Sequence, residues 1–372
     1  FTAFVGAVPA ANVDFLSVDL EQPSVWKANL AFDHELPWAG MVLSAEYIRT
    51  EVENGIFYKH LNIGAPTAVG VDGRNLFYTP QGLNTACWRD NGSTITNGAC
   101  TGLRSRALNN PNFNNVLVAE ETGKGGGQNL SLTVSGAFND EINWSFGYSY
   151  TEATEVSPLT SSVSNSNWNS VSVFQTNEEV EANSTYLVKD RFLGQINWSR
   201  AFFGDYQTRV GVFYEGRSGR PYSWNFDNDV NGDGNINDRL YIPTAFGSGD
   251  VVFRDVSGNG SSVDEEQLFW NIVNANGLNR FAGRVVDRNS SFAEWTNTFD
   301  VRISQELPGF FKGNKTVIAL DILNFGNLLN KDWGRIEEIG FQSLGGLSRS
   351  FVVGLGLTED GRYVYGVNDS IE

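Results

Sequence analysis

The chain has 372 residues, a hydrophobic fraction of 41% and a formal net charge of −17 at pH 7. No apolar run approaches the roughly 18 residues that a membrane helix needs, so any membrane crossing would have to be made by strands. The negative charge argues against nucleic acid as a partner. The 40 glycines and the 13% aromatic content are typical of many short turns and aromatic-rich strands.

Four hairpins with alternating apolar and polar residues follow one another along the chain. They are predicted at about residues 25–52, 129–150, 186–215 and 295–324. In the third hairpin Phe192, Ile196 and Trp198 fall on one face and Arg191 and Gln195 on the other, which is the period-two pattern of a strand. Strands in soluble domains usually have about 5–6 residues, whereas a tilted strand needs about 9–11 to cross a bilayer. The length of these strands therefore indicates a membrane.

Long polar loops join the hairpins, at about residues 53–128, 151–185, 216–294 and 325–372. The first loop shows no long periodic element, and in the third the stretch 265–278 has the spacing of a short helix. A further short hairpin, 350–357 with 362–367, is placed in the last loop. Structureless loops of this length count against a compact soluble domain. An outer-membrane barrel is expected to have this asymmetry, with short turns in the periplasm and long loops outside the cell.

The positions of several aromatic and polar residues are also consistent with an outer-membrane barrel. Trp26, Trp38, Trp144, Trp198 and Trp295 lie at or near strand ends or turns, where interfacial aromatic girdles lie, although core tryptophans of a soluble sandwich give the same pattern. Polar residues on the other face are expected to line the barrel lumen. These are Lys189, Arg191, Gln195, Arg209, Arg302 and Gln305.

The two cysteines, Cys87 and Cys100, lie close together in the first long loop. A local disulfide in an oxidising compartment is favoured over a metal-binding pair.

The segment 229–238 matches the first half of an EF-hand calcium loop, with oxygen-bearing side chains at alternate positions and Gly at the sixth. The twelfth position, normally a bidentate Glu, is Leu240, which excludes a complete EF-hand. The candidate Ca²⁺ ligands, at the extracellular side, are Asp229, Asn231, Asp233, Asn235 and Asp238, the last replacing the missing carboxylate. Asn, Asp and Gly also form hydrogen-bonded turns without metal, so both interpretations stay open.

Catalytic motifs are missing from the sequence. The only histidines are His34 and His60, and no G-x-S-x-G, H-E-x-x-H or phosphate-binding loop is present. We therefore do not expect an enzyme.

Four segments together resemble the barrel of TonB-dependent outer-membrane receptors, and more narrowly the Oar-like (OmpA-related) branch of that family. They lie at 218–243 (SGRPYSWNFDNDVNGDGNINDRLYIP), 269–278 (FWNIVNANGL), 289–315 (NSSFAEWTNTFDVRISQELPGFFKGNK) and 319–334 (ALDILNFGNLLNKDWG). The resemblance implies an all-β fold, an antiparallel transmembrane β-barrel of about 22 strands closed inside by a plug. Residues 1–372 would be the C-terminal part of that barrel, with the plug, the N-terminal domain and the last strand outside this chain.

The same resemblance implies a function. A receptor of this kind, in the outer membrane of a Gram-negative bacterium, binds a ligand with its extracellular loops and imports it into the periplasm. Its expected partners are outer-membrane lipid and lipopolysaccharide, an extracellular ligand, and the TonB energy-coupling complex reached through the absent N-terminal part. Two alternatives stay open: an outer-membrane adhesin or structural barrel protein without transport, and a soluble secreted sugar-binding β-protein.

Overall fold

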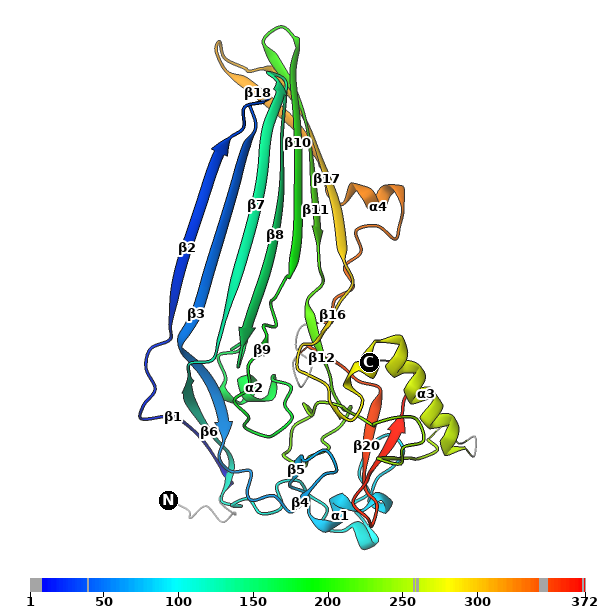
Figure 1. The fold of residues 1–372 in the computed structure, drawn as a ribbon. Helices are drawn as coiled ribbons and strands as arrows, with labels where there is room; N and C mark the ends of the chain where they lie inside the picture. Colours follow the sequence, from blue (N-terminus) through cyan, green and yellow to red (C-terminus); the bar gives the residue numbers. More distant parts are fainter. Residues whose placement is uncertain are drawn as a thin grey trace.

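The structure is a computed structural model that describes residues 9–38, 40–256, 258, 261–340, 347–369 and 371. It has two parts, a tall twisted sheet of long strands and a compact region at one end of that sheet (Figure 1). We call this region the loop body, and define it as the described residues of 61–112, 156–189, 218–295 and 347–369. The predicted mostly β fold is confirmed.

Eight long antiparallel strands form the sheet in the order β2-β3-β7-β8-β10-β11-β17-β18. They are β2 (Ser24–Glu35), β3 (Val42–His60), β7 (Gly125–Asn139), β8 (Ile142–Glu155), β10 (Asp190–Phe203), β11 (Tyr206–Arg217), β17 (Thr296–Pro308) and β18 (Lys315–Ile322). Tight turns join them in pairs at the end far from the loop body (Figure 1). Among the described residues no pairing joins β2 to β18, so the sheet is open at both edges.

The expectation that residues 53–128 lack a long element is wrong. β3 continues to His60, and β6 (Phe113–Thr122) pairs antiparallel with this extension. β1 (Ala11–Leu16) pairs with β6 in parallel, and β9 (Ala182–Asn183) adds a short pairing to β8. The extension was missed because both of its faces contact other residues near the loop body, so its sequence does not alternate cleanly.

The two faces of the sheet differ in chemistry. One row of paired residues across five strands reads Ile142, Trp198, Val210, Ile303 and Leu320. The next row on the opposite face reads Asn143, Asn197, Gly211, Arg302 and Asp321. We call these the apolar face and the polar face. Side chains of the apolar face are open to the surroundings, with Ile196 54% and Leu320 58% exposed.

The strand register shows on which face of the sheet the residues expected in the lumen lie. Arg191, Gln195, Arg209 and Arg302 lie on the polar face, whereas Lys189 precedes β10. The placement of Gln305 is wrong, because it pairs with Thr208 and Ile318 in a row of the apolar face. Gln305 is three residues from Arg302, and residues an odd number apart in a strand point to opposite faces.

Tryptophans lie towards both ends of the sheet. Trp26 and Trp295 are at the end near the loop body, and Trp38 lies in the turn between β2 and β3. Trp144 and Trp198 lie near the turn end of β8 and β10. Trp26, Trp38 and Trp295 are 56%, 59% and 47% exposed, so these three are not core residues of a sandwich.

The hydrophobic core lies in the loop body. Trp224, Ile242, Phe269, Phe351 and Tyr365 are completely buried there and belong to one cluster. The Trp224 and Phe351 rings meet edge to face with centroids 5.6 Å apart. The expected long polar loops are therefore packed around a common core. The sequence did not show this because most core residues come from strands of two to six residues, from helix α3 or from connecting segments, none of which gives a strand-like periodic signal.

Short elements position these core residues. The strands of the loop body are β4 (Ala68–Val69), β5 (Asn75–Leu76), β12 (Pro221–Trp224), β13 (Tyr241–Ile242), β14 (Val252–Phe253), β15 (Arg284–Val285), β16 (Ser291–Phe292), β19 (Ser348–Arg349), β20 (Val352–Leu357) and β21 (Tyr363–Val367). The helices of the chain are α1 (Pro80–Leu83), α2 (Ser164–Asn169), α3 (Ser262–Ala275) and α4 (Phe325–Leu329), with 3₁₀ turns η1 (Thr85–Cys87), η2 (Gly98–Cys100) and η3 (Leu278–Phe281). No helix among the described residues is long and apolar enough to cross a membrane.

Two of these elements were predicted approximately. α3 begins three residues before the expected 265–278 because Ser261 accepts a hydrogen bond from the backbone N–H of Asp264 and caps the helix. β20 and β21 pair as a hairpin inside the loop body and take no part in the long sheet. Residues 341–346, in the last expected loop, lie outside the described residues.

Candidate functional site

The segment 229–238, between β12 and β13, lies inside the loop body. Asn231, Asp233, Asn235 and Asn237 have at most 3% of their surface exposed, and Asp238 has none. Asp229 is partly buried. The segment is thus covered by other parts of the loop body rather than presented on its surface.

Short-range hydrogen bonds shape this segment. The Asp229 carboxylate accepts from the N–H of Gly232 (2.6 Å) and of Gly234 (2.9 Å), and Asp233 Oδ1 accepts from the N–H of Asn235 (2.9 Å). Gly232 has φ +77°, and a Cβ there would lie 2.6 Å from the Tyr78 ring. Both the left-handed backbone and the close approach of Tyr78 therefore require glycine at this position.

Asp238 has a different environment from the other predicted ligands. Its Oδ1 lies 2.7 Å from Nη1 of Arg74, and its Oδ2 accepts from the N–H groups of Val230 (2.8 Å) and Asn231 (3.1 Å). Arg74 is also paired with Asp72, at 3.2 Å. Asp238 is thus bound to a guanidinium.

Negative charge is concentrated in this region. Burial, together with repulsion from Asp233 and Asp238, raises the pKa of Asp229 well above its usual range. Burial and the charge of Asp238 raise the pKa of Asp233 to about 7. Among the described residues neither Asp229 nor Asp233 forms an ion pair within 4.0 Å. Arg74 is matched by Asp72 and Asp238, so it does not neutralise the other two carboxylates.

A small cavity of about 20 Å³ adjoins the segment. Its lining includes Ser157, Trp168, Thr176, Asp233 and Asn237. The Thr176 hydroxyl donates to Asp233 Oδ2 at 2.7 Å. The buried Oδ1 of Asn237 and Oγ of Ser157 have no hydrogen-bond partner among the described residues. Within the described part of the chain, no group of three or more Asp, Glu, His or Cys side chains is arranged to hold a metal ion.

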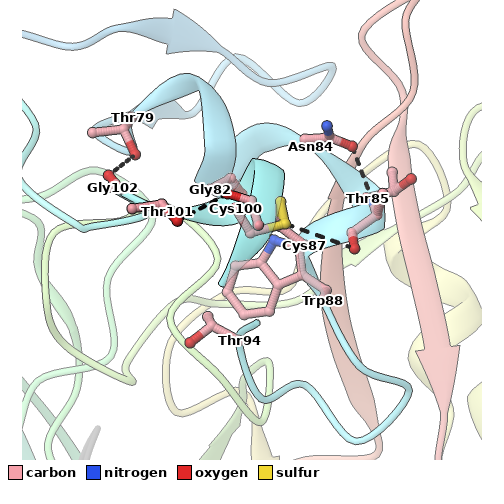
Figure 2. Close-up of a disulfide and its surroundings, with 12 residues drawn as sticks. Thr79, Gly82, Asn84, Thr85, Cys87, Trp88, Thr94, Cys100, Thr101 and Gly102 are labelled. Carbon is pink, nitrogen blue, oxygen red and sulfur yellow. Dashed lines mark hydrogen bonds between the residues drawn. A yellow bond between two sulfur atoms is a disulfide. The ribbon is translucent and has the colours of Figure 1, made fainter. Parts of the chain in front are cut away.

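The structure contains a disulfide between Cys87 and Cys100, which closes a short loop beside α1 (Figure 2). Both cysteines are buried. The indole N–H of Trp88 donates to the carbonyl of Gly82 at 2.8 Å, and the Trp88 ring meets Tyr78 edge to face. Tyr78 in turn donates its hydroxyl to the Asp229 carbonyl at 2.7 Å. The disulfide loop therefore supports one side of the segment 229–238.

A larger hollow of about 550 Å³ lies where β3, β7 and β8 meet the loop body. Its lining includes Ile48, Thr50, Lys124, Thr151 and Glu155. Glu155 accepts hydrogen bonds from Ser184 and Thr185, and Lys124 donates to the Glu179 carbonyl at 2.7 Å. This hollow is large enough for a small molecule.

The sequence pattern identifies the loop 229–238 but not several residues that lie next to it in the folded chain. Asn237 carried a usable signal, because it occupies the ninth position of the EF-hand-like pattern, where a ligand is often found. Arg74, Tyr78, Thr176 and Ser157 come from distant segments with no recognisable motif. Only the folded loop body brings them to the site.

No protein-family model and no curated protein matches the sequence. Among solved structures, the chain is similar to the outer membrane transporter YddB from Escherichia coli, with 12% sequence identity and a TM-score of 0.42. The similarity covers 96% of this chain and 33% of that protein, so this chain spans about a third of its length.

Proposed function

We propose that this chain is part of the barrel of a TonB-dependent outer-membrane receptor that takes up a ligand into the periplasm. The observation that carries the proposal is the apolar face of the sheet. Ile196, Phe299 and Leu320 on this face are 40% exposed or more, although the apolar residues form continuous rows across neighbouring strands. An apolar surface of this extent is expected to be covered, and lipid covers the outer face of a transmembrane barrel.

Strand length and polarity support the same proposal. Seven of the eight long strands have 12 to 19 residues, more than the about 9–11 that a tilted strand needs to cross the hydrocarbon layer. The polar face carries Asn197 and Arg302, as expected for the inside of a barrel. Segments 218–243 and 319–334 resemble this receptor family, and the resemblance favours a transporter over other classes of outer-membrane barrel protein.

Among the described residues, β2 and β18 each have one edge with no strand partner. Backbone N–H and C=O groups along β2 and β18 would lack partners in lipid, and each such group costs several kcal/mol there. In the membrane these two strands would pair with further strands of the same protein. The tight turns would face the periplasm and the loop body would lie outside the cell, where the hollow beside Lys124 and Thr151 is the candidate ligand site.

The orientation can be tested in cells. The full-length protein, expressed in a Gram-negative host, is expected in the outer-membrane fraction, and protease added to intact cells is expected to cleave the loop body but not the turns. Recovery of the full-length protein as a detergent-free, water-soluble monomer would contradict the membrane assignment and favour a secreted β-protein. Ligand accumulation that is unchanged in a host lacking TonB would contradict import and favour an adhesin or structural barrel.

A further inference from the structure

Two carboxylates of the segment 229–238, those of Asp229 and Asp233, have no cationic partner among the described residues. Arg74 forms ion pairs with Asp72 and Asp238, and these three side chains have 0–1% of their surface exposed. Asp233 is also 1% exposed, yet no cationic side chain among the described residues pairs with it. Asp229 adds a second unpaired carboxylate in the same segment. Burying a carboxylate without a counter-charge is strongly unfavourable, so a further positive charge is expected here.

A second observation points to the place of that charge. Asn237 is 1% exposed, and its amide nitrogen donates to the Val171 carbonyl at 2.8 Å. In the part of the chain that the structure describes, neither its Oδ1 nor the Oγ of Ser157 has a hydrogen-bond partner. Both residues line the cavity of about 20 Å³ that Asp233 also lines. Buried polar oxygens in proteins are nearly always satisfied, and a cavity of this size accommodates one small species.

We propose that this cavity holds a Ca²⁺ ion bound by side-chain oxygens of Asp233 and Asn237, with the hydroxyl of Ser157 as a further ligand. Hard oxygen donors suit Ca²⁺, which takes six to eight of them, and Thr176, Asn177 and Glu178, which also line the cavity, bring further side-chain oxygens to it. Asn237 thereby takes the role that the sequence pattern suggested for Asp238, whose carboxylate is bound to Arg74. Asp229, Asn231 and Asn235 shape the loop around the ion, and the unpaired charge of Asp229 favours a cation.

The ion would act as a brace for the loop body. Thr176 and Asn237 come from segments more than 55 residues apart. Thr176 donates a hydrogen bond to Asp233, and Asn237 lines the same cavity as Asp233. Asp229 contacts Tyr78, which packs against the disulfide loop. A cation at this point would connect the segment after β8, the loop before β13 and, through Tyr78, the disulfide loop. Its removal is expected to loosen all three together.

Terbium(III) luminescence tests the proposal, because Trp168 lines the cavity and its excited indole can sensitise a bound Tb³⁺ ion. The full-length protein, purified in detergent and freed of metal with EGTA, is expected to bind one Tb³⁺ per chain with sensitised emission that Ca²⁺ displaces. Asp233→Asn and Asn237→Ala are each expected to weaken Ca²⁺ binding by at least about tenfold, since affinity follows the charge and number of oxygen ligands. The matched control Asp360→Asn removes an exposed carboxylate at the tip of the β20–β21 hairpin and is expected to leave binding unchanged.

Thermal unfolding distinguishes a Ca²⁺ ligand from a residue that only supports the fold, because only the effect of substituting a ligand depends on Ca²⁺. In EGTA, Asp233→Asn is expected to unfold at or above the temperature of the unmodified protein, because the substitution removes a buried unpaired charge. In millimolar Ca²⁺ the order is expected to reverse, because only the unmodified protein gains from the ion. The absence of any Ca²⁺-dependent shift would overturn the proposal. Equal effects of Asn237→Ala with and without Ca²⁺ would also overturn it, by assigning the cavity to a water molecule.

Discussion

The Arg74 guanidinium lies 2.7 Å from the Asp238 carboxylate, and neither side chain is exposed to solvent. The two residues are 164 positions apart. Arg74 also binds Asp72, which accepts a hydrogen bond from the Tyr363 hydroxyl at 2.9 Å. One buried cation therefore connects the segment around β5, the loop 229–238 and the β20–β21 hairpin.

Breaking this ion pair on one side is expected to destabilise the loop body. Arg74→Met leaves two buried carboxylates without their partner, and removing one member of a buried pair costs about 3–5 kcal/mol. The double variant Arg74→Met/Asp238→Asn is expected to recover part of this loss, because it also removes one of the stranded charges. Denaturant unfolding of the full-length protein in detergent measures both effects. A double variant less stable than Arg74→Met would contradict this account.

The assignment of the apolar face to lipid predicts a contrast between two adjacent residues of β10. Ile196 lies on the apolar face and Gln195 on the polar face. Ile196→Lys is expected to destabilise the folded protein in lipid vesicles by about 2–4 kcal/mol if the site lies near the bilayer midplane. Gln195→Lys should change the stability little. The fraction folded after urea titration in vesicles measures the difference, and equal effects of the two substitutions would argue against lipid on this face.

The disulfide is expected to stabilise the loop body. Cys87 and Cys100 are 13 residues apart, and closing a loop of this length contributes about 3 kcal/mol in the chain-entropy model. Replacing both cysteines with serine should lower the free energy of unfolding by about that amount. Alkylation of non-reduced protein followed by intact-mass measurement checks the bridge itself, and labelling of both cysteines would show that it is absent.

The core of the loop body is expected to be more sensitive than its surface. Phe269 is completely buried and contacts Phe351 and Tyr365, so Phe269→Ala should cost about 3–5 kcal/mol. Phe246 is 48% exposed, and Phe246→Ala serves as the control with a much smaller effect. Limited proteolysis should show early cleavage within the loop body of the Phe269 variant while the long strands stay protected. Simultaneous cleavage of both parts would show that they do not unfold separately.

Local patterns in the sequence were sufficient for the main features of the sheet. Alternation of apolar and polar residues depends only on near neighbours in the chain, so strands such as β10 and β11 and the turn between them could be predicted directly. The same holds for the short helix expected at 265–278 and for the EF-hand-like spacing of residues 229–238, because each depends on a few consecutive residues. The Ser261 cap, which starts α3 three residues earlier, was not predicted. The predicted lumen position of Gln305 is wrong because Gln305 is three residues from Arg302 in β17 and therefore lies on the opposite face of the sheet.

Local sequence patterns are enough to predict a mostly β protein with long two-faced strands, tight turns at one end and a glycine-bent acidic loop. Three features appear only in the folded chain: the long loops share a core around Trp224 and Phe269, Asp238 binds Arg74, and Asn237 and Ser157 line the same cavity as Asp233. The difference comes from the range of the interactions. Strand alternation and loop turns are set by neighbours in sequence. Burial, hydrogen bonding, ion pairing and cavity lining join residues as far as 291 positions apart, which no local pattern encodes.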